Sequence, residues 1–216
     1  EQQQNKYKNI RQTAFIVTFL VAMVSVVAFF GWENVTNYFS AKINGKDADY
    51  YLKKEWIVSE YGLPILQVET PEVLVRDLVT SKNPNIKNIS QFSWQKPEDK
   101  LAISVQTIAY KDSVKVNLKQ LFNDGLSQLI QEEAKKIQTT AKKFKNVKAL
   151  SGDVLEGTFE ITEANETKKM RFFTVFISDS YGLQTVRITH DAKDILAKDF
   201  IDRITNSLEQ INQEDE

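Results

Sequence analysis

The chain contains a single histidine, His190, and histidine is the residue type best suited to acid–base or metal chemistry near neutral pH. Asp191 follows it directly, and Asp194 comes three residues after that. Metal sites and catalytic sites built on histidine need further ligands or an orienting partner. A lone histidine lacks them, so we interpret His190 as a strand-end residue beside the cap of the last helix.

No other residue pattern points to catalysis. The absence of cysteine excludes disulfides, thiolate zinc sites and cysteine nucleophiles. The sequence also has no phosphate-binding glycine loop, dinucleotide fingerprint, zinc-protease motif, serine nucleophile elbow or EF-hand loop. The aspartates near the C-terminus are predicted to lie along a helix, whereas a calcium site needs looped oxygen ligands. We therefore expect no enzyme activity, no catalytic residue, no cofactor and no metal.

Lysines are concentrated between residues 135 and 148, a stretch without arginine. At the C-terminal end of a helix, lysines are favoured by the helix dipole. A more specific interpretation is contact with an anionic lipid or an acidic partner, for which the candidates are Lys142, Lys143 and Lys145. The whole chain has 28 Lys+Arg against 29 Asp+Glu and a net charge of -1, a balance that argues against nucleic-acid binding.

An apolar segment near the N-terminus is predicted to be a transmembrane helix over residues 12–32. It contains no Asp, Glu, Lys or Arg. About 20 helical residues span the roughly 30 Å of hydrocarbon in a bilayer. Its last residues include Phe29, Phe30 and Trp32, where a cleaved signal peptide would need small side chains. The segment is therefore interpreted as a retained anchor that makes the lipid bilayer one partner of the protein.

The charges beside this segment predict its orientation. Lys6, Lys8 and Arg11 precede it, whereas Glu33 is the first charged residue after it. The positive-inside rule places residues 1–11 in the cytoplasm as a short stub and the C-terminal domain on the extracytoplasmic side, periplasmic in a bacterium. The aromatic side chains at the end of the segment would then form the membrane-interface belt on the outer side: Phe29, Phe30 and Trp32.

Residues 33–61 are predicted to connect the anchor to the domain through amphipathic helical pieces. Apolar residues recur at helical spacing up to Asn44-Gly45, and an aromatic-rich piece follows from Asp49 to Ile57. Three interpretations stay open: contact with the membrane surface, binding of a partner, and packing onto the domain. The candidate residues for contact with a partner or lipid are Tyr38, Phe39, Tyr50, Tyr51 and Trp56.

Residues 62–212 are predicted to form one soluble domain, followed by an acidic tail over 213–216. Apolar runs predict strands over 65–70, 73–79, 90–95, 101–109, 154–162, 170–177 and 183–189. Helical spacing predicts a long helix from Leu118 to Phe144, with Asn117 as its N-cap and Gln120 as the capping-box partner. A second helix is predicted from Asp191 to Ile211. The expected fold class is α+β: a largely antiparallel β-sheet covered by two long helices, preceded by one N-terminal transmembrane helix.

Turns and strands in the second half of the domain follow a recognisable order. They are the turn Ser151-Gly152, the strand Val154–Phe159, the aromatic strand Arg171–Ile177, the turn Tyr181-Gly182 and the ending Phe200–Leu208. This order resembles the PsbP-like fold, known from extrinsic subunits of photosystem II and from anchored bacterial proteins. The resemblance covers about residues 60–210. It implies a PsbP-like α/β sandwich and a role in assembly or as an accessory subunit.

These observations leave three functional hypotheses of different classes. The leading one is a membrane-anchored, extracytoplasmic binding or assembly domain, a non-catalytic accessory subunit whose partners are other subunits of a membrane protein complex. The alternative is an anchored carrier domain that holds an apolar ligand or lipid between sheet and helix. An enzyme comes third, and a carboxylate pair buried in one pocket would support it. The scarcity of catalytic residue types favours the first hypothesis.

The predicted orientation can be tested by protease accessibility. Protease added to intact cells or spheroplasts should digest the C-terminal domain while a cytoplasmic marker protein stays intact, because the domain is expected on the outer side. Immunoblotting of the domain and of the marker gives the result. Digestion that requires the membrane to be breached first would reverse the orientation.

Overall fold

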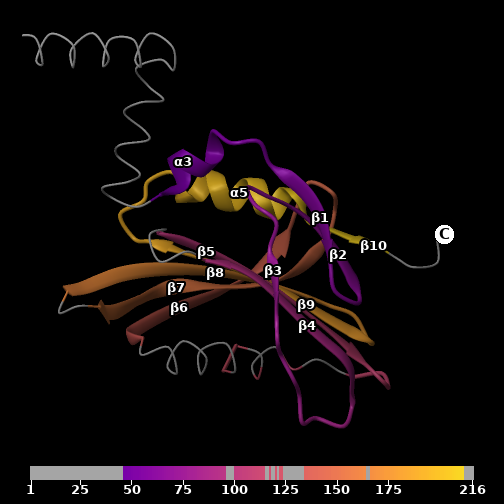
Figure 1. Cartoon of the computed structure of the whole chain (residues 1–216). Coiled ribbons are helices and arrows are strands. Elements are labelled where there is room, and N and C mark those ends of the chain that lie inside the picture. Colours follow the sequence, from indigo (N-terminus) through magenta and orange to yellow (C-terminus); the bar gives the residue numbers. More distant parts are fainter. Residues whose placement is uncertain are drawn as a thin grey trace, which may run out of the picture. The chain divides into compact units, whose positions relative to one another are not determined.

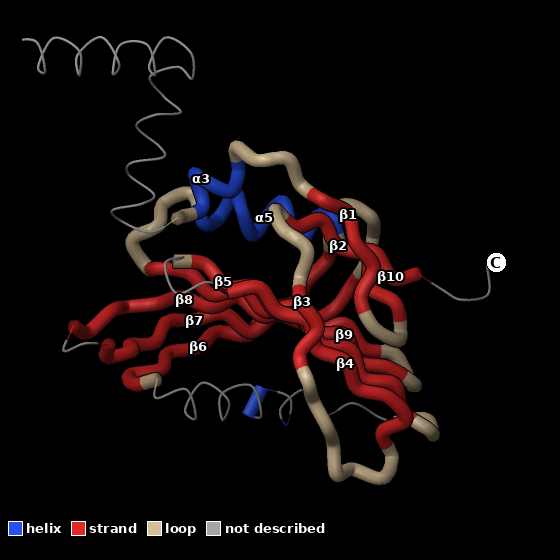
Figure 2. The backbone as a smooth tube through the Cα atoms, in the orientation of Figure 1, coloured by secondary structure: helices blue, strands red, loops and turns tan. Residues whose placement is uncertain are grey.

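The computed structural model describes residues 46–95, 100–114, 117, 120, 122–123, 134–163 and 166–211. They belong to one compact unit that begins at Lys46. Its large sheet has seven strands, in the spatial order β3 (Val75–Asp77), β4 (Ile86–Gln95), β5 (Leu101–Tyr110), β9 (Gly182–Asp191), β8 (Glu166–Ser178), β7 (Ser151–Glu163) and β6 (Lys135–Lys145) (Figure 2).

A small sheet and two helices complete the described unit. The small sheet has the order β1 (Ile57–Tyr61), β2 (Ile65–Thr70) and β10 (Glu209–Ile211). The helices are α3 (Ala48–Leu52) and α5 (Ala197–Ser207), and both lie over one face of the large sheet together with the small sheet (Figure 1). We call the covered face the inner face. All strand pairs in both sheets are antiparallel.

The inner face forms the main hydrophobic core because alternate residues of each strand point toward α5. In β5 these residues are Leu101, Ile103 and Val105, each at most 2% exposed. Phe200 and Ile204 of α5 meet them with no exposed surface. The small sheet adds side chains to the same core, so helix and small sheet together close one side of the large sheet. Its contributions are Tyr61, Leu66 and Val68.

The opposite face carries a second, smaller hydrophobic cluster. Strand β8 supplies both clusters, since Val175 and Ile177 point to the inner face whereas Phe172 and Phe176 point to the other. An interior strand with apolar residues on both faces is what the sequence predicts for 170–177. Phe122, from the segment between β5 and β6, packs on Phe176 with ring centroids 5.4 Å apart.

One buried amide joins α5 to the turn between β6 and β7. Asn146 is 7% exposed, and its Nδ2 donates to the carbonyl oxygens of Thr205 (3.1 Å) and Leu208 (2.8 Å). Its Oδ1 accepts from the backbone N–H groups of Lys148 and Leu150, both at 3.0 Å. All four hydrogen-bonding positions of the side chain are therefore used. Two of them satisfy carbonyls at the C-terminal end of a helix, which lack partners within the helix.

The expectation of two long helices covering the sheet is wrong, and the fold is mostly β. The predicted helix from Leu118 to Phe144 fails at its C-terminal part, where residues 135–145 form strand β6. The predicted cap itself is present, since the Gln120 N–H donates to Asn117 Oδ1 at 3.3 Å.

The apolar spacing in this stretch misled the prediction because it fits a helix by coincidence. Ile137 and Phe144 are seven residues apart, two turns of a helix but opposite faces of a strand. In the structure Ile137 packs in the second cluster and Phe144 against the main core. The β-branched pair Thr139-Thr140 favours the strand.

The second predicted helix, from Asp191 to Ile211, is also shorter than expected. The carboxylates of Asp191 and Asp194 accept backbone N–H groups of Lys193 and Leu196, which holds the chain in turns before α5. Beyond the helix, the chain extends into β10 and pairs with β2. The PsbP-like sandwich implied by the resemblance is therefore not shown.

No helix in the described ranges is long and apolar enough to cross a membrane. The predicted transmembrane helix over 12–32 lies outside the described residues, and so do Phe29, Phe30 and Trp32 of its interface belt. The structure gives the transmembrane expectation no support, and it remains a statement about the sequence alone.

Substitution of Asn146 by Asp should destabilise the domain. The carboxylate keeps the size of the amide but cannot donate to the two helix carbonyls, so buried acceptors lose their partners beside a buried charge. We expect a loss on the order of 3 kcal/mol in the free energy of unfolding, measured by urea denaturation. The matched control is Asn85→Asp on an exposed loop, which should change little. Equal effects of the two substitutions would contradict the role given to Asn146.

Candidate functional site

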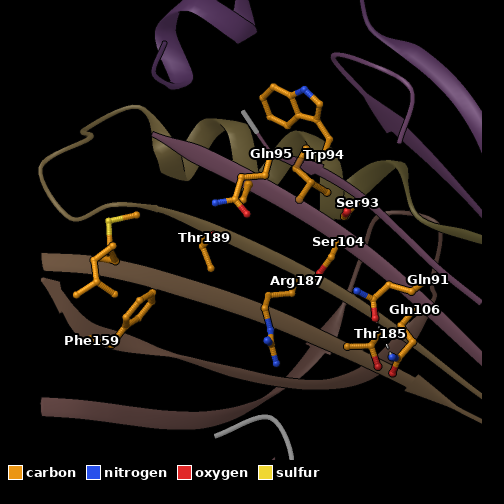
Figure 3. Close-up of a pocket in the computed structure, with 14 residues that line it drawn as sticks. Gln91, Ser93, Trp94, Gln95, Ser104, Gln106, Phe159, Thr185, Arg187 and Thr189 are labelled. Carbon is orange, nitrogen blue, oxygen red and sulfur yellow. Dashed lines mark hydrogen bonds between the residues drawn. The ribbon is translucent and has the colours of Figure 1, made fainter. Parts of the chain in front are cut away.

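Polar side chains gather on the face of the large sheet opposite α5, over strands β4, β5 and β9. They line a pocket of about 550 Å³. Ile103 and Val105 of β5 point into the main core. The residues that alternate with them, Ser104 and Gln106, therefore point to the opposite face and line this pocket. We call this surface the polar face and define it by Gln91, Ser93, Gln95, Ser104, Gln106, Thr185, Arg187 and Thr189 (Figure 3).

Arg187 is the charged side chain within the polar face, and it lies centrally. Figure 3 shows it between Phe159 on one side and Gln91, Gln106 and Thr185 on the other. In the strand register Arg187 is opposite Ser104 of β5. The pocket thus passes from amide and hydroxyl groups to an apolar wall that belongs to the second cluster: Phe159, Ile161 and Met170.

A chain of hydrogen bonds fixes the orientation of two glutamine amides in the polar face. Gln91 Nε2 donates to Asp77 Oδ2, and Gln106 Nε2 donates to Gln91 Oε1, each at 3.2 Å. A carboxylate only accepts hydrogen bonds, so Asp77 determines which end of the Gln91 amide faces it. Gln91 then sets the orientation of Gln106 in the same way. The two amides are therefore oriented before any ligand arrives.

The polar face is suited to binding rather than to proton transfer. Its amides and hydroxyls donate and accept hydrogen bonds but do not ionise near neutral pH, and an arginine stays protonated. Within the ranges that the structure describes, no group of three or more His, Cys, Asp or Glu side chains is placed to hold a metal ion.

The aromatic residues predicted to contact a partner or lipid pack onto the domain. Tyr51 has no exposed surface and meets Trp94 edge-on, with ring centroids 4.7 Å apart. The Trp56 indole N–H donates to the Tyr51 carbonyl at 2.9 Å, and the ring packs on Phe200. Tyr50 is half-buried beneath the ammonium groups of two lysines. Tyr38 and Phe39 lie outside the described residues.

The lysine candidates lie on β6, an edge strand of the large sheet. Lys142 and Lys143 point to opposite faces and pair with Glu156 and Asp153 of β7, each at 2.7 Å. Lys145 follows at the end of the same strand. Lysines on an edge strand hinder pairing with the edges of other molecules. The strand therefore distributes these lysines along an edge and does not collect them in one patch.

His190 lies in β9 on the inner face and is 5% exposed. Its Nδ1 is 2.8 Å from the Asp191 carbonyl oxygen, and because a carbonyl only accepts, Nδ1 carries the hydrogen. Burial lowers the pKa of His190 below its ordinary value, although the hydrogen bond to Asp191 and the charge of Asp194 act in the opposite direction. Arg171 also lowers this pKa. Burial thus favours the neutral form of the ring in the folded protein.

Sequence reasoning did not find the polar face. Part of each of β4, β5 and β9 has polar residues at alternate positions, which is visible in the sequence. Their assembly depends on the pairing of β5 with β9, whose residues are about eighty positions apart along the chain. Such a pairing cannot be read from local periodicity.

No family model and no curated protein match the chain. Several solved structures are similar in fold, among them two that are only weakly similar. LpqN, described as involved in cell envelope biogenesis of Mycobacterium tuberculosis, has 11% identity and a TM-score of 0.40, and the match covers 74% of this chain and 94% of LpqN. PA94 from Pseudomonas aeruginosa, a protein of unknown function described as a putative regulator, has 9% identity, a TM-score of 0.33 and coverages of 68% and 95%. These likenesses assign no function, and they do not show a PsbP-like family.

Acidification should destabilise the domain through His190. The folded state resists protonation of this ring, whereas the unfolded chain takes up the proton below its ordinary pKa of about 6.5. Stability should therefore fall as the pH drops from about 7.5 to 5.5. His190→Gln cannot titrate, and its free energy of unfolding should change less over this window. Urea denaturation of both proteins at the two pH values tests this, and equal slopes would show that His190 is not the cause.

Proposed function

We propose that this chain is a non-catalytic binding and assembly domain, an accessory subunit of a membrane-associated protein complex, with the polar face as its binding surface. The observation that carries the proposal is the pocket of oriented amide and hydroxyl groups on β4, β5 and β9. The proposal also places the domain on the extracytoplasmic side of the membrane. This part rests on the charges in the N-terminal sequence.

The polar face is prepared for a polar ligand in a way that favours specific binding. Its side chains stand on the strands of a sheet whose inner face is closely packed, so the backbone beneath them is held in place. Groups held in their bound orientation lose less conformational entropy when a ligand binds. The Asp77–Gln91–Gln106 chain provides this for two amides. A polypeptide segment of a partner offers the complementary backbone and side-chain donors and acceptors.

The alternative, a carrier for an apolar ligand, receives less support from the same surface. A cavity for an apolar ligand is lined mainly by hydrophobic side chains. The polar face instead presents glutamine, serine and threonine side chains. The neighbouring apolar cluster is packed against itself, with Phe172 at 2% and Phe159 at 5% exposed. Its side chains therefore offer little surface to a lipid.

Site-specific photo-crosslinking in native membranes tests the proposal. A photoreactive phenylalanine analogue is placed at Gln95, at the exposed end of the polar face, or at Lys82, on an exposed loop. We expect one discrete protein adduct from position 95 and none from position 82, because only the first lies beside the surface where the partner binds. Mass spectrometry identifies the adduct, which should be a subunit of a membrane complex.

A blocking variant makes this result specific. Ser93 is opposite Ser104 in the strand register, so Ser93→Phe should fill the pocket and remove the adduct without unfolding the protein. Circular dichroism checks the fold of this variant. No adduct at position 95, or an adduct that survives Ser93→Phe, would count against the polar face as the binding surface.

A further inference from the structure

A second groove lies on the inner face, where α5 passes over the outer strands of the large sheet. It has a volume of about 690 Å³. We call it the α5 groove and define it by residues of β6, β8, β9 and α5: Lys142, Arg171, Phe173, His190, Lys198 and Ile201. Phe173 belongs to the inner-face core, so this groove and the polar face are on opposite sides of the sheet.

Among the described charges around the α5 groove, one cation takes part in no ion pair with another described residue. Lys142 pairs with Glu156 at 2.7 Å, and Lys198 lies 3.9 Å from Asp202. The Asp194 carboxylate accepts backbone N–H groups from Ala48 at 2.8 Å and from Leu196 at 3.1 Å. Arg171 is exposed, and none of the ion pairs between described residues includes it. Its planar guanidinium can bind a carboxylate or phosphate through two parallel hydrogen bonds.

His190 provides a ring nitrogen beside this cation that can take up a proton and then donate a hydrogen bond. Arg171 and His190 are opposite each other in the pairing of β8 with β9, so their side chains extend from the same face at neighbouring positions. Because Nδ1 donates to the Asp191 carbonyl, the lone pair of the neutral ring is on Nε2. No hydrogen bond within the described residues uses Nε2, and His190 lines the groove.

The remaining walls of the groove are apolar. Phe173 forms part of the floor and lies 5.3 Å from the Lys142 ammonium, measured to the ring centroid. Ile201 of α5 faces it from the helix, and Ile195 at the rim is 90% exposed. A ligand that reaches Arg171 with an anionic group can therefore place carbon atoms against these side chains.

We propose that the α5 groove is a binding site for a small ligand bearing an oxyanion, a carboxylate or a phosphate, with Arg171 as the anion anchor and His190 as its neighbour, whose Nε2 takes up a proton and donates it in a hydrogen bond to the bound oxyanion. This site is independent of the polar face. An anion bound there stabilises the protonated ring, so anion binding should strengthen as the pH falls. The other charged groups around the ring are Asp191 and Asp194 before α5, Lys142 of β6, Glu156 of β7, and Lys198 and Asp202 of α5.

The experiment uses His190 as its own reporter, because the chain has no other histidine and the ring resonances in an NMR spectrum need no assignment. Inorganic phosphate and acetate are titrated separately into the protein at an ionic strength held constant with sodium chloride. We expect at least one of the two to shift the His190 resonances with saturation at millimolar concentrations, typical of one charge-assisted contact. The same ion should raise the pKa of His190. The ion whose titration saturates the shift shows whether the site prefers a phosphate or a carboxylate.

Two variants of equal net charge separate a site from a general charge effect. Arg171→Gln should weaken the apparent affinity about tenfold or more, the equivalent of one lost charge-assisted hydrogen-bond pair. Lys169→Gln removes one positive charge two residues away on the same strand, outside the groove lining, and should leave the affinity within about twofold. Shifts that never saturate, or that persist unchanged in Arg171→Gln, would overturn the proposal.

Discussion

The Asn146 amide is the interaction on which the arrangement of the described unit depends most. Its two donors hold the last carbonyls of α5, and its oxygen shapes the turn between β6 and β7. The helix end is thereby fixed to the far edge of the large sheet. From this point the chain continues into β10, which pairs with β2, and Ser207 Oγ accepts the Glu69 N–H at 2.9 Å. Asn146 therefore joins the helix to the edge of the large sheet, and the residues at and after the helix end join it to the small sheet.

This linkage decides what each face of the large sheet can do. With α5 held over the inner face, that face becomes hydrophobic core near the middle of the helix and a charged groove toward its N-terminal end. On the other face, apolar residues gather over β7 and β8, whereas amides and hydroxyls gather over β4, β5 and β9. The two faces differ in chemistry because successive residues of one strand point in opposite directions.

The parts of the fold that the sequence predicted are those determined by local alternation. The strand expected over 65–70 is found at Ile65–Thr70, and that expected over 101–109 at Leu101–Tyr110, because each has a clear period of two. Strand β6 could not be predicted in this way, since its two large apolar residues, Ile137 and Phe144, pack on different faces and fit a helix equally well. The candidate site depends on the pairing of β5 with β9, a tertiary contact that no local pattern encodes.

Strand β9 shows how closely the two surfaces depend on one register. Thr185, Arg187 and Thr189 belong to the polar face, whereas the alternate residues Val186, Ile188 and His190 belong to the inner face. A slip of one residue would exchange all of them at once, placing an arginine in the core and valine in the pocket. The turn before β9 resists such a slip, since Asp179 Oδ1 accepts the N–H groups of Tyr181 and Gly182 at 2.7 and 2.6 Å. Both surfaces therefore depend on a single well-defined hairpin, even though they offer different chemistry to their ligands.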